Sequence, residues 1–281
     1  MEIFKQIAPL RVHLDQLRKS NNSIGLVPTM GALHEGHISL IQASKSQNAV
    51  TVATIYINPT QFNNPKDLQK YPKTPEKDLA MLENAGCDVV FCPDDQEMYT
   101  EKSMVNFDFG NLDKVMEGKF RPGHFSGVAL VVSKLFNIVQ PDRVYFGQKD
   151  WQQFAVIRLL VRELKFNLEV HSVPILRESD GLAMSSRNLR LSPPQRSSAK
   201  VLYESLLMAH KAISSGTPLE TVKKAVFEKV NETPEMKLEY FELANSKNLT
   251  ILNNVDNSVL PILCIAAYAG EIRLIDNMFL D

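Results

Sequence analysis

The sequence predicts an α/β fold in which a Rossmann-like parallel sheet is followed by a smaller α+β domain. Over the first 175 residues, short apolar segments alternate with longer helical ones, the order that builds a parallel sheet through right-handed crossovers. From residue 193 the order changes to helices followed by strand-like segments. We therefore expect one domain over residues 1–175 and a second over residues 176–281.

The strands of the first domain are expected at short apolar segments: residues 23–28, 49–58, 87–93, 143–147 and 168–175. The segment AVTVATIYIN is rich in β-branched residues, which is typical of a strand buried on both faces. The intervening helices are expected over residues 37–47, 75–85, 125–140 and 150–164. The second of them has clear boundaries, with Thr74 as N-cap, Pro75 at the first helical position, Glu76 in the first turn and Gly86 just past the end.

The second domain is expected to combine a helical pair with antiparallel strands. Its helices are predicted over residues 193–216 and 218–232, and its strands over residues 237–245, 260–269 and 271–278. A tight Ala-Gly turn separates the last two strands, which indicates a β-hairpin.

The composition is that of an ordinary soluble globular protein, with 44% hydrophobic and 22% charged residues. A net charge of −1 argues against a broad surface for nucleic acid or for an anionic membrane. The N-terminus lacks the apolar core of a signal peptide, and VLPILCIAAYAG is too short to span a bilayer. We expect Cys87, Cys92 and Cys264 to be buried structural thiols in a cytoplasmic protein, with Cys87 and Cys92 on opposite faces of one strand.

Parallel sheets of this kind bind ligands at the carboxyl ends of their strands. Polar motifs follow four of the expected strands. These are PTMGALHEGH at residues 28–37, NPTQF at 58–62, FGQKDWQQ at 146–153 and DGLAMSSRN at 180–188. Their convergence on one edge of the sheet predicts a single site there.

The pair His34 and His37 stands at a turn from strand to helix. A helix N-terminus offers unpaired N–H groups and partial positive charge, and two imidazoles there would add donors for phosphate. Gly36 lets phosphates approach the backbone closely. The alternative is a metal site, but closed zinc sites take about four ligands and the other histidines are scattered. The chain has neither the dinucleotide G-x-G-x-x-G pattern nor a P-loop.

The other motifs suit phosphate, ribose or amide contacts. Asn58 and Gln61 could bind a small polar substrate, Lys149 a phosphate and Asp150 a ribose hydroxyl. Two hydroxyls and a guanidinium, from Ser185, Ser186 and Arg187, suit phosphate oxygens. Weaker candidates are Arg121 and His124 in RPGHFSG.

Together with RPGHFSGV and KLFNIVQPD, these motifs closely resemble the pantoate–β-alanine ligase (pantothenate synthetase) family. HEGH is similar to the HIGH-type motif of a wider nucleotidyltransferase superfamily, and MSSR to its KMSKS loop. The resemblance implies an ATP-dependent enzyme that converts (R)-pantoate into an enzyme-bound pantoyl adenylate, releasing pyrophosphate. The amine of β-alanine would then displace AMP and form pantothenate.

The resemblance also implies roles for particular residues. The groups around the phosphates would be His34, His37, Lys149, Ser185, Ser186 and Arg187, with Mg²⁺ bridging the phosphates. The ATP site would be formed by Met30, Gly31, Ala32, Leu33, His34, Glu35, Gly36, His37, Gly147, Gln148, Lys149, Asp150, Leu176, Met184, Ser185, Ser186 and Arg187. Pantoate would be held by Gln61 and Gln153, assisted by Asn58.

The family implies a homodimer, and the position of DGLAMSSRN near the domain junction suggests that the second domain acts as a lid. Two alternatives stay open. One is a related adenylyl-transferring enzyme that acts on another small acid, and the other is a nucleotide-binding sensor or RNA-binding module without turnover. The paired Gln61 and Gln153 favour the ligase, because the generic fold does not require them.

Overall fold

The computed structural model describes residues 1–256 and 258–280, which divide into two compact units. The first unit comprises Met1–Phe109, Arg121–Gln148 and Val156–Pro174. The second comprises Gly110–Phe120, Lys149–Ala155 and Ile175–Asp281. The chain therefore passes between the units repeatedly, because two short segments from its first 174 residues belong to the second unit.

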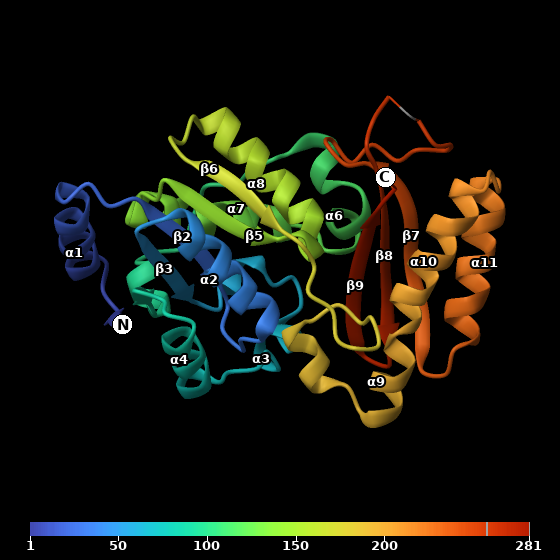
Figure 1. The fold of residues 1–281 in the computed structure, drawn as a ribbon, viewed down its shortest axis with the longest axis horizontal. Coiled ribbons are helices and arrows are strands. Elements are labelled where there is room, and N and C mark those ends of the chain that lie inside the picture. The colour runs from blue at the N-terminus through green and yellow to red at the C-terminus, as the bar shows by residue number, and fades with distance from the viewer. Residues whose placement is uncertain (257, 281) are drawn as a thin grey trace. The chain divides into compact units, whose positions relative to one another are not determined.

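The first unit is built on a parallel sheet with the strand order β1-β4-β3-β2-β5-β6 (Figure 1). The strands are β1 (Glu2–Phe4), β2 (Ile24–Thr29), β3 (Val50–Ile55), β4 (Val89–Phe91), β5 (Arg143–Gly147) and β6 (Glu169–Val173). This confirms the predicted Rossmann-like sheet. Strand β1 was not predicted, because a charged N-terminal segment gives no strand pattern; it pairs with β4 in register Ile3↔Val90.

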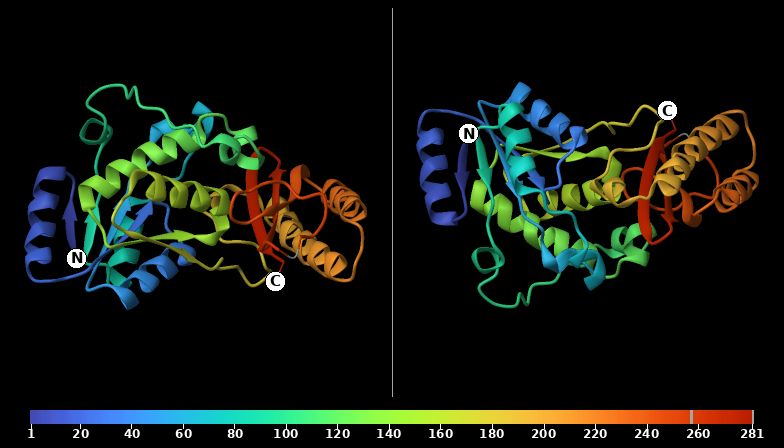
Figure 2. Two further views of the ribbon diagram at one scale, coloured as in Figure 1. Left: turned by 90° about the horizontal axis from the view of Figure 1, so that it is seen from above. Right: turned by 90° about the horizontal axis from the view of Figure 1, so that it is seen from below.

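Helices cover both faces of this sheet (Figure 2). The helices of this unit are α1 (Ile7–Lys19), α2 (Glu35–Gln47), α3 (Pro65–Gln69), α4 (Pro75–Asn84), α5 (Asp95–Met98), α7 (His124–Val139) and α8 (Trp151–Leu164), the last of which begins in the second unit. After β2, strand β3 pairs with β2 and β4 pairs with β3. Strand β5 instead pairs with the other side of β2. The carboxyl ends of β2 and β5 thus form the switch point where ligands bind in such sheets.

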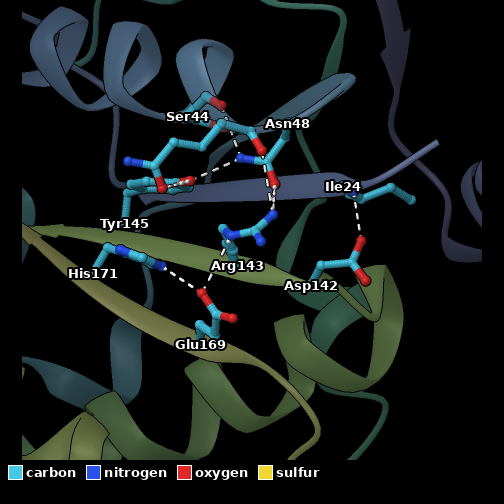
Figure 3. Close-up of polar contacts among 9 residues, drawn as sticks. Ile24, Ser44, Asn48, Asp142, Arg143, Tyr145, Glu169 and His171 are labelled. Atoms are coloured by element: carbon cyan, nitrogen blue, oxygen red, sulfur yellow. Dashed lines mark hydrogen bonds and ion pairs between the residues drawn. The ribbon is translucent and has the colours of Figure 1, made fainter.

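The opposite, amino-terminal edge of the sheet is held by polar contacts (Figure 3). The Asp142 carboxylate accepts a hydrogen bond from the Ile24 backbone N–H at 2.7 Å, and Arg143 pairs with Glu169 at 3.2 Å. Hydrogen bonding from His171, together with the Arg143 charge, lowers the pKa of Glu169 below its ordinary value. These groups connect neighbouring strands. His171, which belongs to none of the sequence motifs, has Glu169 as its hydrogen-bond partner.

The second unit packs helices against an antiparallel sheet with the order β7-β8-β9. Its strands are β7 (Met236–Asn245), β8 (Pro261–Ala269) and β9 (Ile272–Phe279), and its main helices are α9 (Pro193–Ala199), α10 (Val201–Ser214) and α11 (Leu219–Glu232). The predicted β8–β9 hairpin is confirmed. The single helix expected over residues 193–216 is instead two helices that meet at Lys200.

Apolar side chains of α10, α11 and the sheet form the core of the second unit, and Figure 1 shows both helices on one face of the strands. The second unit also contains η2 (Gly110–Asp113), α6 (Met116–Phe120) and η4 (Ser186–Arg190), while η1 (Pro59–Gln61) lies in the first and η3 (Gln148–Asp150) begins there.

The cysteines are free thiols, but two predictions about them are wrong. Cys87 and Cys264 are buried, whereas Cys92 is only partly buried. Cys87 and Cys92 flank β4 rather than lying on it, and both pack against the same apolar cluster around Val90. The expected opposite faces therefore do not apply.

Candidate active site

The two histidines of HEGH form a reciprocal cap at the start of α2. His34 is the N-cap, and its Nδ1 accepts from the backbone N–H of Gly36 at 3.1 Å. His37 Nδ1 accepts from the backbone N–H of His34 at 3.3 Å. The ring centroids lie 4.1 Å apart. Because each Nδ1 uses its lone pair as an acceptor, each neutral ring carries its proton on Nε2.

This arrangement gives the pair a defined chemistry. Two Nε2–H donors stand at a helix N-terminus, where unpaired backbone N–H groups and the helix dipole already favour an anion. The turn comes directly after the carboxyl end of β2, at the switch point of the sheet. Over residues 1–256 and 258–280, no group of three or more His, Cys, Asp or Glu side chains could hold a metal ion.

The NPTQF motif forms η1 with Asn58 as its N-cap, and the side chains of Asn58 and Gln61 are buried. Asn58 Nδ2 donates to Gln61 Oε1 and to the Gly127 carbonyl oxygen, both at 3.2 Å. Gln61 Nε2 in turn donates to the Met30 sulfur at 2.9 Å. The structure thus brings together Asn58, Gln61 and Met30. The Gln61 amide oxygen faces Asn58, and its amide nitrogen faces Met30.

Tyr99 also belongs to this hydrogen-bond network, although no motif indicated it. Its hydroxyl donates to Asn58 Oδ1 at 2.8 Å, which leaves the Asn58 amide nitrogen to face Gln61. Burial raises the pKa of Tyr99, so the hydroxyl keeps its proton. A pocket of about 580 Å³ lies against this contact and includes Thr60 and Tyr99 in its lining. No local pattern marks Tyr99, which is 41 residues from its partner in sequence.

Helix α7 packs against η1 and supports it. His124 is buried, and its Nδ1 lies 2.8 Å from the Gln61 backbone carbonyl oxygen, which accepts a hydrogen bond from it. A Cβ on Gly127 would stand 2.2 Å from the Thr60 carbonyl oxygen, so glycine is required for this close packing. His124, one of the weaker candidates from RPGHFSG, therefore contacts the backbone of the NPTQF motif.

In the second unit, Lys149 follows the carboxyl end of β5 in sequence. Its side chain is 17% exposed, with Nζ 3.9 Å from Asp150 Oδ1, and Asn277 Nδ2 donates to its backbone carbonyl at 2.8 Å. Its neighbours on α8 differ in role. Gln152 is buried and bonds to the Leu112 carbonyl and the Glu117 backbone N–H, whereas Gln153 is only partly buried.

The MSSR segment is held in place within the second unit. An isolated bridge joins Arg177 to Ala183, and the Met184 backbone N–H donates to the Leu176 carbonyl at 3.0 Å. Ser185 is the N-cap of η4, with Oγ accepting from the Arg187 backbone N–H at 3.3 Å. The adjacent Ser186 is buried and Arg187 is partly buried. These contacts order the backbone that presents the predicted phosphate ligands.

The candidate residues are therefore distributed over both units. The first unit contains Met30, Gly31, Ala32, Leu33, His34, Glu35, Gly36, His37, Asn58, Gln61, Gly147 and Gln148. The second contains Lys149, Asp150, Gln153, Leu176, Met184, Ser185, Ser186 and Arg187.

Within the described residues, no helix is both long and apolar enough to cross a membrane.

The fold and these motifs define the class of protein: an α/β protein whose parallel strands end in loops suited to a nucleotide. The family model for pantoate-beta-alanine ligase matches residues 2–279. A pantothenate synthetase from Bacteroides thetaiotaomicron is 46% identical over 278 residues, covering 99% of this chain and 98% of the relative. One from Cytophaga hutchinsonii is 47% identical over 273 residues, covering 97% and 96%.

Solved structures give the same result. Pantothenate synthetase from Thermus thermophilus superposes with a TM-score of 0.92 at 40% identity over 99% of each chain. A pantoate-beta-alanine ligase from Francisella tularensis, complexed with beta-gamma ATP and beta-alanine, gives a TM-score of 0.85 at 36% identity, covering 100% of this chain and 98% of that one. The chain belongs to the pantoate–β-alanine ligase family, and the predicted family and enzyme class are confirmed.

Proposed function

We propose that this protein condenses (R)-pantoate with β-alanine to form pantothenate, using ATP. In the first step a carboxylate oxygen of pantoate attacks the α-phosphorus of ATP, forming a pantoyl adenylate and expelling pyrophosphate. In the second step the β-alanine nitrogen attacks the acyl carbon. The amide bond forms, AMP leaves with the electron pair of the broken bond, and the nitrogen loses a proton.

The observation that carries this proposal is the cap formed by His34 and His37. Its two Nε2–H donors at the N-terminus of α2 can stabilise the charge that develops on phosphate oxygens during adenylation. The protein supplies no nucleophile in this chemistry, so rate acceleration comes from positioning and charge stabilisation.

We assign ATP binding to the predicted residues of each unit. In the first unit these are the segment from Met30 to His37, together with Gly147 and Gln148. In the second they are Lys149, Asp150, the backbone of Leu176, and the segment from Met184 to Arg187. The Lys149 ammonium and the Arg187 guanidinium add the positive charge that ATP needs, because the protein as a whole is nearly neutral.

We assign pantoate to Gln61 and Gln153, with Asn58 assisting by orienting Gln61. Amides recognise hydroxyl and carboxylate oxygens without adding negative charge beside ATP. The Gln61 amide nitrogen, which contacts Met30 Sδ in this structure, can donate to a substrate oxygen when substrate is present.

Mg²⁺ is proposed as the cofactor; when bound, it would neutralise negative charge on the ATP phosphates. Phosphate oxygens and water would supply most of its ligands, as is usual for Mg²⁺ bound with a nucleotide. We further propose a homodimer, as the family resemblance implies, and a cytoplasmic location, as the free thiols favour.

The test is a mass-spectrometric product assay with ATP, Mg²⁺, D-pantoate and β-alanine, run with and without the amine. Pantothenate and AMP should form together, and pantoyl adenylate should stay on the enzyme when β-alanine is omitted. Absence of both AMP and adenylate would refute the ligase proposal. Turnover with another small acid but not with pantoate would favour the related adenylyl-transferring enzyme.

We expect His37→Ala and Lys149→Ala to slow adenylation by about 10²- to 10³-fold, the range found for groups that stabilise transition-state charge. Single-turnover formation of AMP measures this step directly. Asn137→Ala, on the exposed side of α7, is the control and should keep the wild-type rate. Wild-type adenylation in both active-site variants would contradict the assigned roles.

A further inference from the structure

Asp78 on α4 is a buried carboxylate, 1% exposed, that bonds to the loop preceding the histidine pair. Its Oδ2 accepts from the Ala32 backbone N–H and its Oδ1 from that of Leu33, both at 2.8 Å. The Thr74 hydroxyl also donates to Oδ1, at 3.0 Å. The Thr74 side chain makes no cap bond to the helix backbone, so its hydroxyl acts on Asp78 instead.

The loop needs such a partner because of its backbone conformation. Gly31 has φ +76° and Ala32 has φ +48°, so two consecutive residues are in the left-handed region. Successive backbone N–H groups in turns of this kind form a concavity that binds anions. Here the chain's own carboxylate occupies it. A Cβ on Gly31 would lie 2.9 Å from Asp78 Oδ2, so only glycine leaves room for the carboxylate.

The same loop connects two parts of the candidate site. It begins after Thr29, at the carboxyl end of β2, and it ends at His34, the N-cap of α2. It includes Met30, whose sulfur accepts from Gln61. Asp78 accepts hydrogen bonds from the backbone N–H groups of Ala32 and Leu33. These bonds therefore determine where the backbone of the neighbouring His34 lies.

We propose that Asp78 is a positioning residue for ATP: its carboxylate holds residues 31–33 in their left-handed turn, and thereby places Met30 and His34. This inference rests on the proposed function, because it assumes that the loop and the α2 N-terminus bind the nucleotide. Asparagine is isosteric, but its NH₂ group would face one of the backbone N–H donors. Asp78→Asn should therefore lose one bond and release the loop.

The experiment combines steady-state kinetics with amide hydrogen exchange on the full chain. Asp78→Asn should raise the KM for ATP by about tenfold or more, as expected when a supporting group lets a binding group move. The KM for β-alanine should change by less than about twofold. Exchange should accelerate in the peptide spanning residues 29–36 and stay unchanged at β6. A purely structural effect would lower stability without separating the two KM values.

Two further variants keep the test decisive. Thr74→Val removes only the hydroxyl bond to Asp78 and should raise the KM for ATP by about two- to threefold, whereas Thr74→Ser should match wild type. The matched control is Asp142→Asn. It removes a comparable carboxylate-to-backbone bond, to Ile24 at the opposite edge of the sheet (Figure 3), and should leave the KM for ATP unchanged.

The inference is overturned if folded Asp78→Asn keeps the wild-type KM for ATP and wild-type exchange over residues 29–36. If Asp78→Asn does not fold, Thr74→Val decides by the same two readouts. If the wild-type protein forms neither AMP nor adenylate, the proposed function fails. In that case amide exchange of wild type and Asp78→Asn over residues 29–36, measured with and without ATP, still decides whether Asp78 holds the loop.

Discussion

At the scale of single residues, hydrogen bonds fix the orientation of the side-chain amides of Asn58 and Gln61. An amide presents an acceptor at one end and a donor at the other, so its partners decide what it can recognise. Tyr99 donates to Asn58 Oδ1, and Asn58 Nδ2 donates to Gln61 Oε1. This chain of bonds leaves the Gln61 nitrogen as the donor end. The sequence indicated Asn58 and Gln61 by their motif, but it could not indicate Tyr99.

Tyr99→Phe tests this chain of hydrogen bonds. Without the Tyr99 hydroxyl, Asn58 Oδ1 accepts only the longer hydrogen bonds from the Thr60 backbone N–H and hydroxyl. The Asn58 amide can then rotate. We expect the KM for pantoate to rise about three- to tenfold, while the free energy of unfolding falls by about 1 kcal/mol.

Steady-state kinetics and urea denaturation measure the two effects. Tyr56→Phe is the matched control, because this buried tyrosine donates to Asp95 at 2.9 Å rather than to Asn58. Equal changes in the pantoate KM for both variants would contradict the proposed chain of bonds.

At the scale of elements, the loop that presents MSSR is stabilised by α9. Arg196 of α9 pairs with Glu178 and with Asp180, each at 2.6 Å, and both carboxylates lie in the turn that the Arg177–Ala183 bridge closes. The hydrogen bonds from Arg196 lower the pKa of Asp180 below its ordinary value. Sequence patterns predicted α9 as the start of one long helix, and only the packed unit shows its role as a support for this loop.

Arg196→Gln should lower the free energy of unfolding by about 1 kcal/mol at pH 7. A carboxyl whose pKa is lowered by folding contributes stability above its unfolded pKa, and that stability is lost as the pH falls through the folded value. The difference between wild type and Arg196→Gln should therefore shrink as the pH falls below 3.8, the ordinary value for Asp180.

Denaturant unfolding at a series of pH values measures this effect. Arg162→Gln provides the control, since its exposed partner is the adjacent Glu163 and its removal should change stability by less than about 0.5 kcal/mol. A stability difference for Arg196→Gln that stays constant down to about pH 2 would exclude the ion pair as its cause.

At the scale of the whole molecule, the second unit incorporates segments from early in the chain. Glu117 of α6 pairs with Arg273 of β9 at 2.6 Å, Arg273 also pairs with Glu239, and Tyr240 donates to Glu117. Its two carboxylate partners raise the pKa of Arg273, so the guanidinium stays charged despite burial. Deleting residues 176–281 to test a lid role would therefore remove the partners of residues 110–120 as well.

Glu117→Gln should lower the free energy of unfolding by about 3 kcal/mol, because it leaves a buried cation with half of its compensating charge. Thermal and urea denaturation measure this value. The control Glu228→Gln, in an exposed pair with Lys224 at 3.8 Å, should change stability by less than about 0.5 kcal/mol. Similar effects of the two substitutions would show that the buried network contributes little.

The sequence by itself determined the parallel sheet from β2 to β6, the longer helices between its strands and the motifs at its strand ends. These features depend on local periodicity, capping and turn residues, which any short window contains. The tertiary structure alone decided the strand order that makes β2 and β5 neighbours, the unpredicted β1, and the pairs Asp78–Ala32, Tyr99–Asn58 and Glu117–Arg273. Each of those pairs joins residues at least 41 positions apart, and the packing of whole elements selects them. Local patterns cannot indicate such pairs, because each partner taken alone is an ordinary residue.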